Sequence, residues 1–371
     1  MKDLHSINFI GLIFGILSLA LSFTSLRTTS SIGLIELSLM TVVSYYILNY
    51  FFLESNRPSL IIFLPLIFIL LFVAPMTIFN TLTGFYGSSI TTLIALIFAS
   101  IIGGVASTFD DSFKRSLAMG VGLSCITSIA YIIFSGALYE TLLRFAFLAN
   151  NPNTLALYSL CSCFIVGHLY PKGILRLIFV AAAAFYGIIS LSDSLFLAFF
   201  CGSIAGLFCF LVKRGFFIAS ILILLLIFAL IIINLELNIV QFLSSLWSEA
   251  DEGGGRIKLI MHGIEAYLAS PIIGHGAGAF SGSYNAFGRF EAHNTYIDLL
   301  TIGGPILPII FILPLIFSIP LLYKKGDILS LMFLIAIMIF AFFHFTARHP
   351  IIWIVWGLCT SQLISKLRYK Y

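Results

Sequence analysis

The chain has 371 residues, of which 60% are hydrophobic and 9% are charged, and its formal net charge is +4. A soluble domain carries roughly 25% charged residues, so the composition excludes an ordinary soluble domain and gives no reason to expect a nucleic-acid partner. The first apolar run is too long for a cleavable signal peptide and has no small-residue cleavage site. We therefore expect residues 1–371 to form a single integral membrane domain.

Runs of about 18 or more mainly apolar residues are candidates for membrane-spanning helices. Such runs recur along the chain and predict an all-α polytopic membrane protein with about twelve transmembrane helices and one long extramembrane segment that contains short helices. The predicted spans are residues 7–25, 32–53, 59–79, 90–107, 117–138, 154–170, 174–192, 195–212, 216–234, 295–322, 327–346 and 350–365. Glu36 falls inside the second span, where a carboxylate is costly and is expected to face a partner or a cavity.

The nineteen Lys and Arg residues set the expected orientation. If the N-terminus is cytoplasmic and the spans alternate, thirteen of the nineteen fall in inner segments and six in outer segments. The six outer residues are Arg27, Arg144, Arg256, Lys258, Arg289 and Arg348. Positive residues favour the cytoplasmic side, so we expect both termini to be cytoplasmic and the long segment to lie outside.

The outer basic residues are mostly arginines, which the orientation rule disfavours there. An Arg side chain presents a planar fork of donors that matches phosphate and carboxylate groups. The set therefore suggests that an anionic group is held at the outer membrane surface. The alternative is pairing with nearby acids, for example Arg144 with Glu140 and Arg256 with Asp251 or Glu252.

The long polar segment, residues 235–294, is the expected catalytic part of the chain, because long loops tend to carry function on a rigid scaffold. An apolar stripe predicts a helix over 256–270, which Pro271 ends. The Gly-rich residues 272–282 predict a tight turn or a close backbone approach, and their amides could help to hold an anion. The Cys residues all fall inside apolar spans and show no metal-ligand spacing, so we expect no metal and no cofactor.

Two sets of residues resemble one known family. The first set is Arg256, Ala266, Pro271, Gly274, Gly276, Gly278 and Phe280, followed by His293-Asn294-x-Tyr296 and Gly303-Gly304. The second set is Arg144, followed by Asn151-Pro152-Asn153 and Ala156. Together with the predicted spans and the late polar segment, these residues resemble the bacterial O-antigen polymerase and O-antigen ligase superfamily over most of the chain.

The resemblance implies a GT-C-like, inverting and metal-independent glycosyltransferase in the bacterial inner membrane, with its site facing the periplasm. The donor would be a glycan on undecaprenyl pyrophosphate. A polymerase, which we favour, would transfer this glycan to a sugar hydroxyl of the next lipid-linked repeat unit, and a ligase would transfer it to lipid A–core. Other expected partners are membrane lipid and, as a candidate, a chain-length regulator protein. A transporter is a remote alternative, because neither inverted repeats nor midplane polar sites are found.

The chemistry of this transfer suggests roles for three residues. His293 is expected to take the proton of the acceptor hydroxyl or to orient that hydroxyl, unless it only caps the following helix. Arg256 and Arg144 are expected to stabilise the leaving pyrophosphate. Further expected substrate contacts are Arg289, Asn294, Asn153, Arg348, Asp193 and Tyr296.

One position departs from the family pattern. The family often has an Arg between small residues where this chain has Asp193. We therefore expect Arg144, Arg289 or Arg348 to take the place of that Arg, or Asp193 to contact sugar hydroxyls. The remaining histidines of the segment, His262 and His275, are expected to be surface or loop residues.

Overall fold

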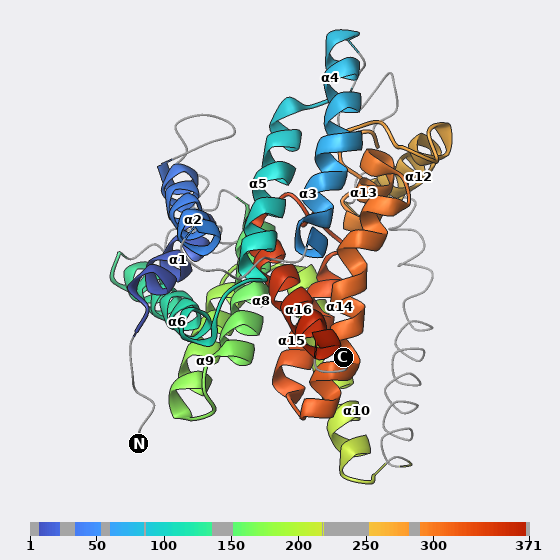
Figure 1. Ribbon diagram of the computed structural model, residues 1–371. Helices are drawn as coiled ribbons and strands as arrows, with labels where there is room; N and C mark the ends of the chain where they lie inside the picture. Colours follow the sequence, from blue (N-terminus) through green and yellow to red (C-terminus); the bar gives the residue numbers. More distant parts are fainter. Residues whose placement is uncertain are drawn as a thin grey trace.

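The computed structural model describes residues 7–22, 34–52, 60–84, 87–135, 151–216, 218, 252–281 and 290–368. Within these ranges the regular elements are helical, and the only extended pairing is an isolated antiparallel bridge between Ser88 and Gly278 (Figure 1). The helices are α1 (Phe9–Ala20), α2 (Leu34–Phe52), η2 (Leu60–Phe63), α3 (Leu64–Phe68), η3 (Ile69–Val73), α4 (Ala74–Leu82), α5 (Ile90–Ala106), α6 (Asp111–Phe134), α8 (Pro152–Leu169), α9 (Ile174–Ile188), α10 (Asp193–Lys213), α12 (Glu252–Ala269), α13 (Thr295–Gly303), α14 (Ile306–Lys325), α15 (Ile328–Phe340) and α16 (Pro350–Arg368).

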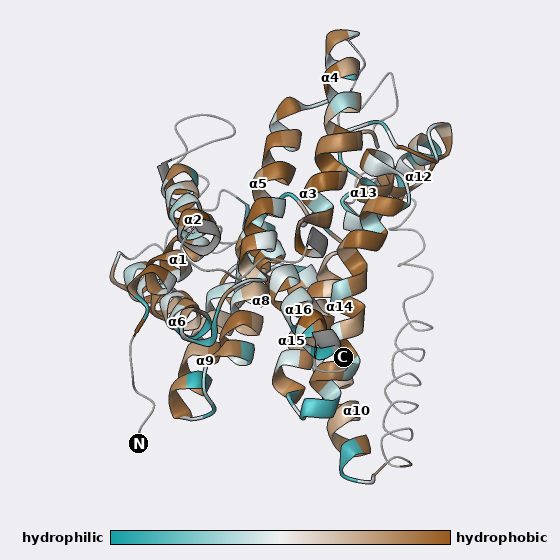
Figure 2. Cartoon of the chain, in the orientation of Figure 1, coloured by the Kyte–Doolittle hydropathy of each residue, from teal (hydrophilic) through white to brown (hydrophobic). Residues whose placement is uncertain are grey.

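Many of the helices are apolar enough for a membrane, and hydrophobic residues cover their outward faces (Figure 2). Among the described residues, four helical stretches are long and apolar enough to cross a bilayer: Leu64–Leu82, Asp111–Phe134, Asp193–Lys213 and Ile306–Lys325. Several shorter apolar helices accompany them. The all-helical, multi-pass membrane fold is thus confirmed for the described residues. The count of twelve spans stays a prediction, and the span expected at 216–234 lies almost entirely outside the described residues.

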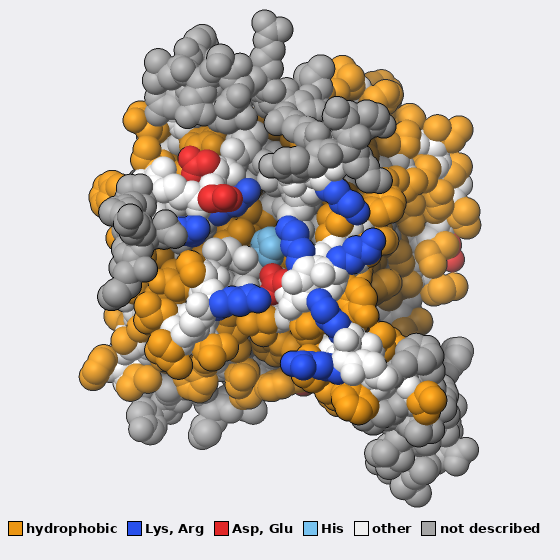
Figure 3. All heavy atoms as spheres, turned by 60° about the horizontal axis from the view of Figure 1, so that its bottom comes forward, with side chains coloured by type: hydrophobic (Ala, Val, Ile, Leu, Met, Phe, Trp, Pro, Cys, Tyr) orange, Lys and Arg blue, Asp and Glu red, His pale blue; other side chains and the backbone are white. Residues whose placement is uncertain are grey.

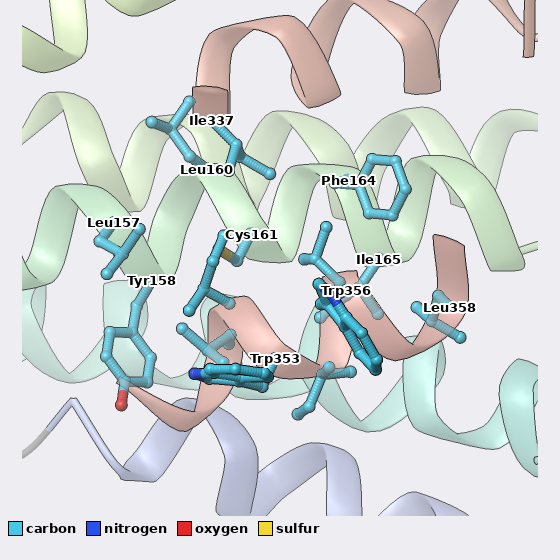
Figure 4. Close-up of a cluster of buried hydrophobic side chains, with 14 of the residues drawn as sticks. Leu157, Tyr158, Leu160, Cys161, Phe164, Ile165, Ile337, Trp353, Trp356 and Leu358 are labelled. Carbon is cyan, nitrogen blue, oxygen red and sulfur yellow. The ribbon is translucent and has the colours of Figure 1, made fainter. Parts of the chain in front are cut away.

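Helix α8 forms the centre of the bundle. Its residues from Thr154 to Gly167 are all buried, and it contacts α6, α9, α10, α15 and α16. Figure 4 shows the apolar side chains of α8 packed against Trp353 and Trp356 of α16 and Ile337 of α15. Pro152 stands in the first turn of α8, where its missing N–H leaves no intrahelical bond unmade. Because α8 is buried from Thr154 onward, the position of its N-terminus is fixed by the packing of the helix itself.

Helices α1 and α6 approach closely through small residues. A Cβ atom on Gly15 would lie 2.3 Å from the Leu117 carbonyl oxygen, and one on Gly120 would lie 2.3 Å from the Leu12 carbonyl oxygen. Neither position has room for a larger side chain. Small residues of this kind let helix backbones meet in membranes, where packing replaces the hydrophobic effect as the driving force.

A carboxylate joins three helices at one end of the bundle. Asp327 lies just before α15, where it accepts hydrogen bonds from Arg176 of α9 (2.9 Å) and Ser330 of α15 (2.6 Å) and contacts Nδ1 of His168 of α8 (3.1 Å). Burial alone would raise the pKa of Asp327, but these hydrogen bonds lower it to about 2. Lys213 donates to the Tyr323 carbonyl oxygen at the same end. We call this end, with its many Lys and Arg residues, the basic end.

The predicted single span at 295–322 is corrected to two helices. The chain breaks between α13 and α14 at Gly304, which has φ 64°, and at Pro305, which has no N–H for a continuous helix. The break makes room for the Gly-rich loop, because a Cβ on Gly304 would lie 2.1 Å from the Ile272 carbonyl oxygen. A positive φ and a close backbone contact thus both require glycine there.

The predicted orientation can be tested by cysteine labelling. Gly255 has open space around the position of a Cβ, and Lys366 is exposed near the end of α16. In a Cys-free background, a membrane-impermeant maleimide should label Gly255→Cys in intact spheroplasts and label Lys366→Cys only after permeabilisation. Labelling of both positions from the same side would contradict the orientation.

Candidate functional site

A polar hollow lies at the end of the bundle where α8 begins and α15 ends. Its lining comes from the start of α8, from α12, from the segment before α13 and from the turn between α15 and α16. The lining residues are Asn151, Asn153, Thr154, Leu157, Arg256, Glu291, His293, Phe340, His344, Phe345, Thr346, Arg348 and His349. Segments that are about two hundred residues apart in the sequence therefore meet at one place.

Asn294 begins α13 as its N-cap. Its side-chain oxygen accepts hydrogen bonds from the backbone N–H groups of Tyr296 (3.0 Å) and Ile297 (3.2 Å). Asn is among the residues preferred at this position, because it satisfies donors that the helix leaves unpaired. Asn294 is buried and does not line the hollow. The residue predicted as a substrate contact is thus engaged as a helix cap, and the capping that was considered for His293 falls to its neighbour.

The backbone on both sides of His293 is clamped by one carboxylate. Asp298, in the first turn of α13, accepts hydrogen bonds from the N–H of Ala292 (2.7 Å) and the N–H of Asn294 (3.3 Å). His293 between them has φ 52°, a left-handed conformation that is uncommon for a residue with a side chain. Such strain persists only where the surroundings enforce it, and it clusters at functional sites.

Thr295 ties the start of α13 to the turn that follows α15. Its hydroxyl donates to the His344 carbonyl oxygen (2.6 Å) and accepts from the Thr346 N–H (2.8 Å), and its own N–H donates to the Ala341 carbonyl oxygen (2.9 Å). The Thr295 side chain is fully buried. His293 and the 341–349 turn are therefore held in a fixed relation.

A chain of hydroxyl groups connects the turn to α8 and α10. His344 Nε2 lies 2.7 Å from Ser194 Oγ, which lies 2.9 Å from Ser192 Oγ, and Ser192 donates to Asn153 Oδ1 (2.7 Å). Asp193, between the two serines, is exposed and does not line the hollow. Its serine neighbours take part in the network, and the contact with sugar hydroxyls expected of Asp193 stays a prediction.

Helix α12 positions Arg256 by packing through a glycine. The predicted helix over 256–270 is confirmed, with α12 spanning Glu252–Ala269. A Cβ on Gly263 would lie 2.7 Å from Ile297 Cγ2 and 3.2 Å from Ala292 Cβ, so α12 rests directly on the segment around His293. Arg256 is two turns before Gly263 and shares its helix face. This face brings the guanidinium to the hollow.

The Gly-rich loop at 272–281 packs against α4, the residues before α5 and the end of α13. Gly276 has φ 81°, and a Cβ there would lie 2.6 Å from the Thr77 backbone nitrogen. The loop's amides donate within the protein: His275 N–H to Thr301 O (2.7 Å), Gly276 N–H to Ile302 O (3.0 Å), Ala277 N–H to Thr77 Oγ1 (2.7 Å) and Ala279 N–H to Gly87 O (3.0 Å). These four amides therefore donate within the protein and are not available to hold an anion. The loop shows the predicted close approach of backbones.

Arg348 stands at the rim of the hollow and is partly exposed. One of its nitrogens forms an ion pair with Glu291, and its guanidinium lies 5.9 Å from the centre of the Phe345 ring. Burial raises the pKa of Glu291, and Arg348 opposes this rise. The pair fixes Arg348 beside His293, which leaves the hollow with Arg256 and Arg348 as cations and Glu291 as its carboxylate.

Two of the imidazoles that line the hollow, those of His293 and His344, are kept neutral. Burial lowers the pKa of His293, and the charges of Arg256 and Arg348 lower it further. Burial and the same arginines, together with His293, lower the pKa of His344 to about 3. A neutral imidazole nitrogen can accept a proton, so His293 is available as a base at pH 7. In the described part of the chain, no three His, Cys, Asp or Glu side chains gather in a way that could hold a metal ion.

The predicted site residues divide into three groups. Arg256, His293, Asn153 and Arg348 line the hollow together. Asp193, Asn294 and Tyr296 do not: Tyr296 donates to the Met338 carbonyl oxygen (2.9 Å) and packs on Phe342. Arg144 and Arg289 lie outside the described residues.

Sequence reasoning missed two histidines of the site. His344 and His349 line the hollow on either side of Arg348. The available signal was the short polar run at 343–349, between the last two predicted spans, which holds both histidines and one arginine. Of this run only Arg348 is predicted from the sequence, because a short connection between two apolar spans carries little local signal for a site.

The capping role of Asn294 gives a specific prediction. Asn294→Ala should lower the thermal stability of the purified protein, since loss of an N-cap costs about 0.5–2 kcal/mol. Asn294→Asp and Asn294→Ser can cap the helix and should retain both stability and activity. A loss of activity in all three variants at unchanged stability would instead indicate a direct substrate contact.

Comparison with known proteins bears on this arrangement. A family model described as O-antigen ligase matches residues 177–312, a little over a third of the chain, from α9 through α13 into α14. The matched part contains the serines of the hydroxyl network, Arg256 and His293, but not Asn153 or Arg348. No curated protein matches the chain. Residues 177–312 of this multi-pass membrane protein thus match the O-antigen ligase family, which confirms the resemblance to the O-antigen polymerase and ligase superfamily.

Proposed function

We propose that the protein is a glycosyltransferase that moves a glycan from a polyprenyl pyrophosphate to a sugar hydroxyl at the outer face of the bacterial inner membrane. The observation that carries the proposal is the meeting of Arg256, Arg348 and His293 in one hollow, with the imidazole kept neutral. These are the groups that such a transfer needs: cations for a departing pyrophosphate and a proton acceptor for the attacking hydroxyl. The family match supports the same class of reaction.

The donor end of the reaction is assigned to the arginines. When the bond between the anomeric carbon and the pyrophosphate oxygen breaks, negative charge develops on that oxygen. Preorganised cations stabilise such charge strongly in a site that excludes water. Arg256 is carried by α12, whose packing on the His293 segment fixes its direction. Arg348 is the described arginine that takes the place of the one absent at Asp193.

The acceptor end is assigned to His293. The acceptor hydroxyl attacks the anomeric carbon on the face opposite the pyrophosphate, so that the configuration inverts. The new bond joins the hydroxyl oxygen to the anomeric carbon, and the hydroxyl proton passes to the neutral nitrogen of His293. The pyrophosphate leaves with the bonding electron pair. His344 keeps its own imidazole neutral beside this centre and is held by Ser194.

Two acceptors fit this chemistry. A polymerase, our first candidate, uses the next lipid-linked repeat unit, and a ligase uses lipid A–core. The matched family model supports this class of reaction with either acceptor, and the ligase is the second candidate. A lipopolysaccharide ladder from a deletion strain separates the two. Single-repeat glycan on core is the result expected for a polymerase. Complete absence of glycan from core would contradict the polymerase and indicate a ligase.

The arginine assignment predicts that charge alone is not enough. Arg256→Lys and Arg348→Lys keep the charge but lose the two-point fork, and we expect each to lower glycan transfer by roughly 100-fold. The measurement is the glycan ladder in a complemented deletion strain, with protein level checked by immunoblot. Lys258→Arg, on the exposed face of α12, is the matched control and should be neutral. Wild-type ladders from both Lys variants would show that these arginines are structural.

The histidine assignment predicts both a loss and a pH profile. His293→Ala should lower the rate by about 100- to 10,000-fold, and His262→Ala on α12, which does not line the hollow, should not. Because burial and the two arginines lower the pKa of His293 below that of an ordinary histidine, its neutral base form predominates at pH 7. The rate should therefore fall on the acid side, as His293 takes up a proton, and at a lower pH than an ordinary histidine would give.

A purely orienting role would give a different pattern. His293→Gln could then hold the hydroxyl by a hydrogen bond and would retain activity, and the acid limb of the profile would be shallow. Full-length glycan from His293→Ala would remove His293 from the mechanism altogether.

A further inference from the structure

The basic end of the bundle has a hollow of its own. It measures about 430 Å³ and is formed by four helices that are distant in sequence. Its lining residues are Asp111, Lys114 and Arg115 from α6, His168 and Leu169 from α8, Lys325 from α14, and Leu358, Ser361, Gln362 and Ser365 from α16. Figure 3 looks toward this end and shows Lys and Arg side chains around a recess in which a His side chain is visible.

The charges in this hollow do not cancel. Lys114, Arg115 and Lys325 face it together, and Asp111 is the one carboxylate of its lining. The neighbouring Asp110 is committed to the N-cap of α6, where its side chain accepts from the Phe113 N–H (2.6 Å). Three cations in one recess repel one another, and a bound anion relieves that repulsion.

The acid that contacts His168 of the lining is already engaged within the protein. Asp327 accepts from Arg176 and Ser330 and contacts His168, and it stays ionised at neutral pH because its pKa is about 2. It therefore cannot also serve as counter-ion for Lys114 or Lys325 without losing these bonds. Among the described residues, the lining has three cations and one carboxylate, so a bound anion would neutralise its excess positive charge.

The wall of the hollow also contains a buried polar atom without a partner. Gln362 contacts His168 Nε2 through its amide nitrogen, and its Oε1 atom is buried and makes no hydrogen bond. His168 Nδ1 faces the ionised Asp327 and carries the ring proton, so Nε2 accepts from the Gln362 amide and Oε1 is the atom left without a partner. The Ser361 hydroxyl, in the same lining, accepts a hydrogen bond from Lys114 Nζ (3.3 Å).

The preference of positive residues for the cytoplasmic side accounts for basic residues at this end. It does not account for the convergence of Lys114, Arg115 and Lys325 on one hollow. Cationic residues that only set topology can be spread over the ends of separate helices. Here Lys114 of α6 and Lys325 of α14 turn into the same recess, beside polar groups of α16. Basic pockets between membrane helices are a recognised way of holding the head groups of anionic lipids.

We propose that this hollow, opposite the catalytic end, binds a phosphate group through Lys114, Arg115 and Lys325. The phosphate would belong to the head group of an anionic lipid or to a soluble phosphate compound, since the chemistry is the same. The apolar Leu169 and Leu358 in the lining suit a site that opens beside lipid. The proposal does not depend on the reaction assigned to the other end.

The test is a thermal-shift titration of the purified full-length protein at fixed ionic strength. One arm adds phosphatidylglycerol to zwitterionic detergent micelles, and the other adds inorganic phosphate. The double variant Lys114→Gln/Lys325→Gln should weaken binding by about 30-fold, because each Lys near an anionic group contributes roughly fivefold in affinity. Lys172→Gln, an exposed lysine at the same end that does not line the hollow, should keep the wild-type affinity.

A charge-preserving variant guards against a folding artefact. Lys114→Arg/Lys325→Arg should restore binding, and the double Gln variant, relieved of the repulsion, should melt no lower than the wild-type protein when no ligand is present. Binding of phosphatidylglycerol alone would identify a lipid head group, and saturable binding of inorganic phosphate would identify a soluble ligand. An equal loss of binding in Lys172→Gln, or no binding of either probe by the wild-type protein, would overturn the proposal.

Discussion

The site depends on one buried hydroxyl. Thr295 donates to the His344 carbonyl oxygen and accepts from the Thr346 N–H, and thereby fastens the first residue of α13 to the turn after α15. A buried hydroxyl whose hydrogen bonds are all made within the protein rigidifies its surroundings, because breaking one of them leaves a polar atom unpaired away from water. His293 lies two residues before Thr295, so the fixed turn sets its position relative to His344 and Arg348. The Thr295 N–H bond to Ala341 and the Arg348–Glu291 ion pair reinforce this tie between the two halves of the hollow.

Electrostatics then divide the molecule into two unlike ends. At the end proposed to be catalytic, Arg256 and Arg348 lie beside imidazoles that they help to keep neutral. At the basic end, Asp327 is held by Arg176, Ser330 and His168, and the recess has three cations and one carboxylate in its lining. The central helix α8 reaches both ends, with Asn153 near its start and His168 near its finish. A buried, apolar helix thus separates two charged regions and keeps each in place.

Much of this architecture can be predicted from the sequence. The remainder cannot, because it depends on contacts between residues that are far apart in the chain. Periodicity and Pro271 predict α12, and the His-Asn pair marks the start of α13, because helix signals are local. The break at Gly304 depends on the passage of a loop from thirty residues earlier, and local apolarity hides it. The hydrogen bond between His344 and Ser194 joins residues 150 positions apart, so no spacing in the sequence announces it. For Asn294, local pattern favoured a substrate contact, while the N-cap geometry became visible only with the helix that it begins.

The central claim is that the hollow around His293 carries out glycan transfer. The most direct measurement is release of undecaprenyl pyrophosphate by the purified protein, given a lipid-linked repeat unit as donor and acceptor. The account predicts that release and glycan elongation occur in equal amounts and that both are lost in His293→Ala. Undiminished release and elongation by His293→Ala would contradict it.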